Sequence, residues 1–286
     1  MSKMTDAEIS GADNLGKGNP QGVQSKPQKS GNPSGGQVAT TLARGLAILR
    51  CFNVERPTLG VSEIAALIGV PQPTVWRLAN ALVKLGYLGH ARDSGKLRLG
   101  TPVLALGYAV LATMDLPTMA RAQMQAVANQ FQAAVSLACR EGLGMLFLER
   151  CQGPSHLLMN LPVGSVIPLA TSAIGWGYLA GLSPDDRIPL ISELIQTEGG
   201  QLHELKGAIE EALLFYDENG FIMNLGYFHP RVNTVSVPLM LPSDPEKIYV
   251  ISCGGPSSVL TRDNLSKHVG PTLIDLANSL RVSKTG

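Results

Sequence analysis

The segment from Val61 to Leu88, "VSEIAALIGVPQPTVWRLANALVKLGYL", constrains the fold of this chain more than any other stretch. Apolar residues recur at helical spacing on both sides of a short break that contains Gly69 and Pro73. Glycine readily takes the left-handed conformation that ends a helix, and proline fits the first turn of a helix, where its missing N–H is no loss. The segment therefore predicts two helices joined by a tight turn, with Ser62 as a candidate cap of the first.

The second of these helices has two different faces. An apolar stripe, which we expect to be buried, consists of Val75, Leu78, Leu82 and Leu85. The opposite face is polar and basic, with Thr74, Arg77, Ala81 and Lys84. A helix pair with a tight turn and a basic outer face on its second helix is typical of the helix-turn-helix, a DNA-binding motif.

The segments on either side of the pair extend this unit. An earlier helix is predicted from an apolar stripe of Leu42, Leu46, Leu49 and Phe52. After the pair, "YLGHARDSGKLRLG" predicts a hairpin with strands 88–92 and 96–99 and a turn at 93–95. A basic hairpin in this position is the wing of a winged helix.

Charge is divided unevenly along the chain. Residues 37–100 contain eight Lys or Arg and three Asp or Glu, a net charge of +5, whereas residues 101–286 contain eleven and sixteen, a net charge of −5. A basic small domain joined to an acidic larger one indicates that only the first meets a polyanion. Together with the helix pair and the hairpin, this charge predicts DNA binding by residues 37–100.

Two groups of residues are expected to contact DNA. Gln72, Thr74 and Arg77 lie at the N-terminal end of the second helix of the pair, so we expect them to reach base edges. Phosphate contacts are expected from Arg44, Arg92, Lys96 and Arg98. Trp76 has two interpretations that the sequence leaves open, packing on a DNA sugar or filling a gap in the core.

Several classes of protein find no support in the sequence. The four cysteines, Cys51, Cys139, Cys151 and Cys253, form no CxxC pair and have no histidine at ligand spacing, so we expect buried free thiols in a reducing cytoplasm and no metal site. There is no G-x-S-x-G, P-loop or H-E-x-x-H motif, so we expect no catalytic residues and no cofactor. Residues 1–36 are rich in Gly, Ser, Asn, Gln, Pro and Lys, without an apolar signal segment, and predict a disordered tail.

The acidic part of the chain predicts a mixed α/β domain. Residues 101–114 are uncharged and too few for the ~20 residues of a membrane span, so they predict a linker helix with an apolar face. Two strands joined by the turn Gly142–Gly144 come next, then a helix capped by Thr171 or Ser172, and a helix ending at Gly220. Strands at about 221–224, 233–240 and 247–253 and a helix broken near Pro271 complete a sensor-like domain over 115–286.

No residue between Arg150 and Asp185 is charged. Pro162 and Pro168 interrupt this run, which argues against a membrane span. The glycines of "GWGYLAG" are spaced GxGxxxG, which misses the dinucleotide-binding pattern by one residue. The remaining interpretation is the neutral wall of a pocket, with backbone N–H groups near residues 170–173 for a carboxylate and Arg231 as a candidate countercharge.

From about Val38 to its end, the chain resembles the IclR family of bacterial transcriptional regulators. The resemblance rests on the helix-pair block, "LARGLAILRCF", "GKLRLG", "TPVLALGYAVLATMD", "IPLATSAIGWGYLA", Gly220-Phe221 and "VISCGGP". It implies an N-terminal winged helix-turn-helix, a linker helix and a C-terminal GAF-like α/β domain. It also implies a homodimer or homotetramer whose effector is often an organic or aromatic acid of a catabolic pathway.

Carried over by position, the resemblance implies an effector site with two walls. One wall has Met159, Ala173 and Ile174; the other has Asn224, Val232, Thr234, Ser252 and Gly254. Asn224 stands where some members have an acid, and Gly254 where some have a hydroxyl. Both departures are compatible with a bulkier acid, including an aromatic one. Ordinary strand packing is the alternative for each of these residues.

These observations predict a cytoplasmic, sequence-specific DNA-binding regulator controlled by a small-molecule effector. The expected divisions are a tail at 1–36, a winged helix-turn-helix at 37–100, a linker helix at 101–114 and an effector-binding and oligomerisation domain at 115–286. Two alternatives remain: a DNA-binding oligomer that needs no ligand, and an enzyme docked on nucleic acid by its basic domain.

Overall fold

The computed structural model describes residues 34–92, 94–154, 161–197 and 202–282 of the 286-residue chain. The expected disordered tail lies outside the described residues up to position 33, and Met159 lies outside them as well. Residues 34–36, which the sequence assigns to the tail, begin the first helix.

The N-terminal part is a winged helix-turn-helix, as predicted. Its elements are α1 (Ser34–Arg50), α2 (Val61–Ile68), α3 (Gln72–Lys84), β1 (Leu88–His90) and β2 (Leu97–Leu99). The two strands pair antiparallel, and Leu59 adds a bridge to Leu97. Gly69 ends α2 with a positive φ of 64°, and Pro73 lies in the first turn of α3. A small core joins these elements, with Ile48, Phe52, Ile64, Val75, Leu78, Leu88 and Leu97 at its centre.

Two of the predicted apolar stripes in this part are wrong in detail. Ile48 in α1 is buried, as are Cys51 and Phe52 just after the helix, whereas Leu42 and Leu46 are exposed. Leu85, the residue after α3, is exposed too. The reason is geometric: helices of this length pack on their neighbours over only one or two turns, so a stripe that continues to the helix end runs out of partners.

The C-terminal part is built on a six-stranded antiparallel sheet in the order β5-β4-β3-β8-β7-β6. Its strands are β3 (Ala134–Glu141), β4 (Gly144–Gln152), β5 (Val166–Pro168), β6 (Ile222–Leu225), β7 (Val232–Leu241) and β8 (Asp244–Pro256). The helices that come before β6 in this part are α4 (Pro102–Ala112), α5 (Asp115–Phe131), α6 (Ala173–Gly181), α7 (Pro184–Thr197) and α8 (Leu202–Asn219). The chain then runs through α9 (Arg262–Asn264), a π-helical turn (Leu265–Val269) and α10 (Gly270–Val282).

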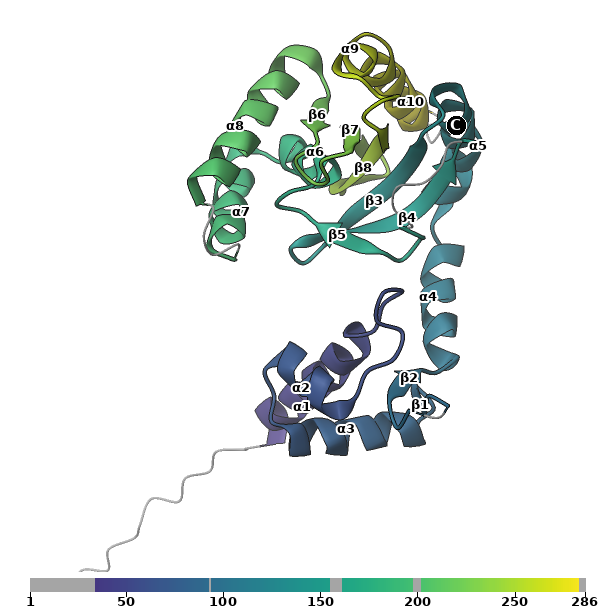
Figure 1. Cartoon of the computed structure of the whole chain (residues 1–286), viewed down its shortest axis with the longest axis vertical. Coiled ribbons are helices and arrows are strands. Elements are labelled where there is room, and N and C mark those ends of the chain that lie inside the picture. The colour runs from purple at the N-terminus through teal and green to yellow at the C-terminus, as the bar shows by residue number, and fades with distance from the viewer. Residues whose placement is uncertain (1–33, 93, 155–160, 198–201, 283–286) are drawn as a thin grey trace, which may run out of the picture. The chain divides into compact units, whose positions relative to one another are not determined.

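Helices cover both faces of this sheet (Figure 1). The face covered by α5 and α10, called the α5 face, buries residues such as Val135, Leu137, Val235, Ile251 and Cys253. The opposite face, called the α6 face, is covered by α6 and α8, and Ala138, Phe147, Ile222 and Val250 are buried there. Alternate residues of each strand supply the two layers, as the two-residue period of a β-strand requires.

Two helical details differ from the expectation or refine it. Helix α7 was not predicted, and Pro189 inside it explains why, since proline weakens any helix signal. The predicted break near Pro271 is the π-helical turn that ends just before it. Proline lacks the N–H that would continue the regular hydrogen-bond ladder, so a local change of pitch beside it is expected.

Helix α4 exposes its apolar side chains. Among the described residues it buries none, and Leu104, Leu106, Tyr108 and Val110 are more than half exposed. No single described helix is long and apolar enough to cross a membrane. The pair α4–α5, bent by 79°, is long and apolar enough for a broken membrane span by length and composition alone.

The glycines of "GWGYLAG" bring α6 close to its neighbours. A Cβ atom at Gly175 would collide with the carbonyl of Leu169. At Gly177 it would lie 2.5 Å from Ser236 Oγ and 2.8 Å from Val250 Cγ1, on strands β7 and β8. The spacing that resembled a nucleotide-binding motif therefore serves helix-on-sheet packing.

Gly177→Ala should lower the free energy of unfolding by about 1–3 kcal/mol, because the added methyl overpacks the contact between α6 and the sheet. The matched control is Gly207→Ala in α8, where a Cβ meets nothing within 4 Å. That change should raise stability by about 0.5–1 kcal/mol, the ordinary helix preference for alanine. Denaturant unfolding of the two variants measures both effects; equal stability of the two would contradict the close approach.

Candidate functional site

The outer face of α3 presents a mixed polar, aromatic and basic surface. Gln72, Trp76 and Arg77 are exposed near its N-terminal end, and Thr74 is half-buried. The Trp76 side chain is 59% exposed, so it does not fill a gap in the core. Its exposure contradicts the core-filling interpretation, and packing on a DNA sugar stays a prediction.

The basic residues expected at phosphates differ in their surroundings. Arg44 and Arg92 are exposed. Arg98 is exposed and donates from Nη1 to the carbonyl of Leu99 at 3.4 Å. Lys96 is already in an ion pair, with 3.0 Å between its Nζ and a carboxylate oxygen of Glu63.

Glu63 links the wing to the start of α2. Its carboxylate accepts the N–H of Gly60 at 2.6 Å, so Glu63 caps this helix and the predicted Ser62 cap does not form. The Gly60 N–H, and after it the Lys96 ammonium, lower the pKa of the Glu63 carboxyl. Lys96 therefore connects the wing to α2 through this ion pair. It is less available to a phosphate than its sequence position suggested.

A cavity opens on the α6 face of the sheet, with a volume of about 740 Å³ including its open mouth. Seven of the eight residues expected at an effector site line it: Ala173, Ile174, Asn224, Val232, Thr234, Ser252 and Gly254. The eighth, Met159, lies outside the described residues. Residues far apart in the sequence, on α6, β6, β7 and β8, are thus brought to one place by the sheet order.

The turn before α6 has its carbonyl groups hydrogen-bonded by side chains. The donor and acceptor pairs are Ser172 Oγ to Pro168 O at 2.6 Å, Trp176 Nε1 to Ala170 O at 2.6 Å, Asn224 Nδ2 to Thr171 O at 3.1 Å and Ser236 Oγ to Ala173 O at 2.6 Å. Ser172 Oγ also accepts the N–H of Gly175 at 3.1 Å, which makes it the cap of α6.

These bonds use carbonyl groups at the start of α6 as acceptors. The N–H groups of Ala173 and Ile174 belong to the first turn of α6, where a helix offers them no acceptor of its own, and both residues line the cavity. A helix N-terminus also carries partial positive charge. This wall of the cavity is suited to an anion.

Asn224 and Gly254 each have a structural reason beside any role toward a ligand. The Asn224 amide donates to Thr171 O and accepts the N–H of Tyr227 at 3.1 Å, so it ties β6 to the turn before α6. At Gly254, a Cβ atom would lie 2.7 Å from Oγ1 of Thr234 on the neighbouring strand. The glycine accommodates Thr234 as well as leaving space in the cavity.

An irregularity in β4 decides which charged side chain enters the cavity. Leu137 of β3 pairs with Glu149, and the next residue, Ala138, pairs with Phe147, so Leu148 is an extra, bulged residue. Such a bulge shifts the side-chain alternation of a strand by one position. Glu149 therefore lies on the α5 face, and Arg150 lines the cavity on the α6 face.

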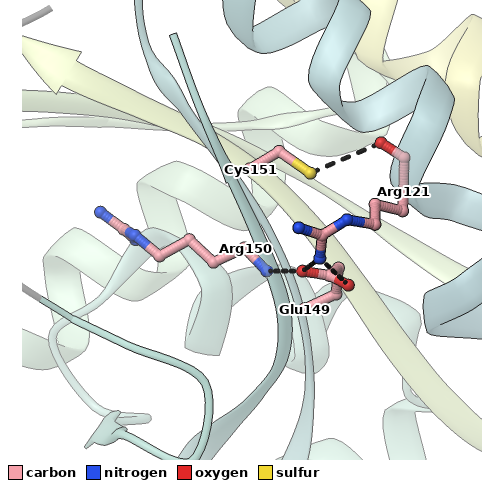
Figure 2. A network of polar contacts seen from close by, with 4 residues as sticks. All are labelled: Arg121, Glu149, Arg150 and Cys151. Carbon is pink, nitrogen blue, oxygen red and sulfur yellow. Dashed lines mark hydrogen bonds and ion pairs between the residues drawn. The ribbon is translucent and has the colours of Figure 1, made fainter.

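Figure 2 shows this separation, with the Arg150 side chain running away from the Glu149 carboxylate. Both oxygens of the Glu149 carboxylate accept from Nη1 of Arg121 in α5, at 2.8 and 2.9 Å, and Oε1 also accepts the backbone N–H of Arg150. The same ion pair raises the pKa of Arg121. The negative charge of Glu149 is satisfied on the far face of the sheet.

Arg150 is the charged group that the sequence interpretation missed. Its Nη1 donates to Ser136 Oγ at 3.0 Å, and its guanidinium lies 5.7 Å from the centre of the Phe147 ring. Burial lowers its pKa. The candidate countercharge named from the sequence, Arg231, is exposed and is not among the residues that line the cavity.

The four cysteines are free thiols, as predicted, and Cys139 is the one that is only half-buried. Burial raises the pKa of each, and for Cys253 to about 12. A thiol with a raised pKa is a poor nucleophile at neutral pH. Within the described ranges, no group of three or more His, Cys, Asp or Glu side chains is arranged to hold a metal ion.

Two family profiles match the chain. The profile of the IclR helix-turn-helix domain matches residues 41–91, and that of the bacterial transcriptional regulator IclR C-terminal domain matches residues 108–282. Among proteins of known sequence, the HTH-type transcriptional regulator TsaQ1/TsaQ2 of Comamonas testosteroni is 33% identical over 250 residues. The match covers 87% of this chain and 89% of that protein.

Solved structures share the architecture. An IclR family transcriptional regulator from Brucella abortus is 35% identical and has a TM-score of 0.79, over 92% of this chain and 96% of its own. An IclR homolog from Microbacterium hydrocarbonoxydans, crystallised as a complex with 4-hydroxybenzoate, has 23% identity and a TM-score of 0.64, over 84% of this chain and 97% of its own. At that identity the second structure shows a shared fold.

Glu63→Gln should speed hydrogen exchange at the backbone amides that begin α2, because it weakens the cap and the Lys96 ion pair. Since the folded protein lowers the pKa of Glu63, this stabilisation is present above the unfolded pKa of about 4.3 and is lost as the pH falls through the folded value. The difference in exchange rate between the variant and the wild type should therefore be largest at pH 7 and disappear at acidic pH. Exchange rates are compared at each pH, with Glu55→Gln in the preceding loop as control; equal rates at pH 7 would contradict the cap.

Proposed function

The chain belongs to the IclR family of bacterial transcriptional regulators, and from this we propose that it binds operator DNA under the control of a small organic acid. In this proposal the winged helix-turn-helix reads the operator and the cavity on the α6 face receives the effector. A regulator of bacterial DNA works beside the chromosome, so we place it in the cytoplasm.

Support for DNA reading comes from the exposed face of α3. Arg77 has the fork of donors that suits the edge of a guanine, and Gln72 the amide that suits an adenine. Trp76 stands exposed beside them. The basic wing residues Arg92 and Arg98 are exposed and suited to phosphates, which fix position without reading sequence.

The observation that carries the effector proposal is the cavity itself. Seven residues expected at an effector site surround it, and its walls combine apolar side chains with a few donors. This is the usual composition of a small-molecule site. The 4-hydroxybenzoate in the Microbacterium structure belongs to that protein, and it supplies the first compound to test.

We further propose that the protein works as a homodimer or homotetramer. The support is the exposed apolar surface of α4, where Leu104, Leu106, Tyr108 and Val110 would gain from a partner. A dimer would read a pseudo-palindromic operator with two heads. An effector could then change DNA affinity only by binding two arrangements of the heads unequally.

Arg77→Ala should relax sequence preference, costing about 1–3 kcal/mol on the best operator and little on random DNA. Lys84→Ala is the matched control, because Lys84 lies two turns farther along the same exposed face of α3. It should weaken binding to all sequences alike and reduce the dependence on salt. Binding-site selection followed by titration at two salt concentrations measures both; uniform losses for the two variants would mean that Arg77 does not read bases.

Ser252→Leu should abolish the response to effector without changing DNA affinity, because a larger side chain on β8 fills the cavity. The matched control, Ser258→Leu, lies in the exposed turn after β8 and should keep the response. The measurement is operator affinity with and without a panel of small organic acids. A protein that binds its operator equally in all conditions would instead favour the DNA-binding oligomer that needs no ligand.

A further inference from the structure

We infer that Arg150 is the residue by which this protein selects its effector, and that the effector is a monocarboxylate with an apolar body. This inference rests on the proposed effector function of the cavity. It names the chemical class of the ligand and the side chain that recognises it. The sequence had indicated Arg231, not Arg150, as the candidate countercharge.

The described lining of the cavity carries a positive charge without a negative one. Among the described residues that line it, Arg150 is the only charged one. The uncharged run from 151 to 184 includes the undescribed segment 155–160, whose sequence has no Asp, Glu, Lys or Arg either. The nearest acid in sequence, Glu149, is turned to the opposite face by the bulge and paired with Arg121.

The contacts that Arg150 makes with described residues do not neutralise its charge. Ser136 Oγ accepts one hydrogen bond, and the Phe147 ring lies 5.7 Å away. A guanidinium has five N–H donors in a planar fork, and a neutral hydroxyl uses only one. A partly buried cation without a carboxylate is costly, and a ligand anion relieves that cost.

The other polar groups at the start of α6 are available as hydrogen-bond donors rather than acceptors. The first-turn N–H groups of Ala173 and Ile174 are donors, and the carbonyls around them are already bonded to Ser172, Trp176 and Ser236. Two sets of donors on the same cavity suit the oxygens of one anion. The carbonyl of a neutral amide could accept from one set, but its NH₂ group would face the other set, and those donors would lack an acceptor.

The single cation limits the charge of the ligand, and the cavity wall selects the uncharged part of the ligand. One guanidinium balances one negative charge, so a dicarboxylate or a phosphate monoester would bring a charge that no described lining residue meets. Apolar side chains form one part of the remaining wall, with Phe147, Leu161, Ile167 and Phe228 among them. An aliphatic or aromatic ring would fill this part.

The test compares each acid with its neutral amide on the full-length protein. The probes are propionate, benzoate, phenylacetate and 4-hydroxybenzoate, each beside the corresponding amide, with affinities measured by calorimetry. In the wild type, the acid that binds most tightly should exceed its amide by about 10- to 100-fold, the contribution of hydrogen bonds to a charged group.

Three variants locate the source of that preference. Arg150→Gln should reduce the ratio of acid to amide to about one, and Arg150→Lys should keep part of it, because lysine retains the charge but lacks the fork. Arg231→Gln is the matched control, since it removes an equal charge from an exposed position, and its ratio should stay at the wild-type value. Each ratio is measured within one variant, so a general loss of stability affects acid and amide alike.

Each outcome decides a specific point. A ratio that collapses only at position 150 supports the inference. A ratio unchanged in Arg150→Gln, or amides that bind the wild type as tightly as acids do, would overturn Arg150 as the selecting residue while leaving the effector site intact. If neither acids nor amides bind the wild type, the proposed effector function itself fails, and this inference fails with it.

Discussion

The close contact between α6 and the sheet is the constraint on which the cavity depends. Gly177 permits the approach, and the Ser236 hydroxyl fixes it by donating to the carbonyl of Ala173 at 2.6 Å. The same contact holds the N-terminal turn of α6 over strands β7 and β8. If the helix stood farther from the sheet, the first-turn N–H groups and the strand residues could not share one cavity.

A second constraint acts through the bulge in β4. It places Glu149 and Arg150 on opposite faces of the sheet, although a regular strand would exchange them. The acid then pairs with Arg121 of α5 and the cation lines the cavity. One extra residue in a strand thus gives the cavity its positive charge. It connects a detail of backbone register with the class of ligand we propose.

Much of the fold follows from the sequence, because the signals that determine it are local. Glycine and proline mark the ends of α2 and α3, and Ser172 marks the start of α6. The residues around the cavity came from the family resemblance, not from physical reasoning alone. Arg150 was missed because simple alternation along β4 would turn it to the α5 face, and a bulge is set by pairing with β3, which no local pattern reveals. The Glu63 bond to Lys96 was missed because it joins residues 33 positions apart.

In the proposed complex, a carboxylate binds between Arg150 and the N-terminus of α6. A crystal structure of the full-length protein with its tightest-binding acid tests this most directly. We expect the carboxylate oxygens within hydrogen-bonding distance of the Arg150 guanidinium and of the N–H groups of Ala173 or Ile174, with the body of the acid toward Phe147 and Phe228. An acid bound elsewhere on the protein, or in this cavity with its carboxylate turned away from Arg150, would show that Arg150 does not bind the carboxylate.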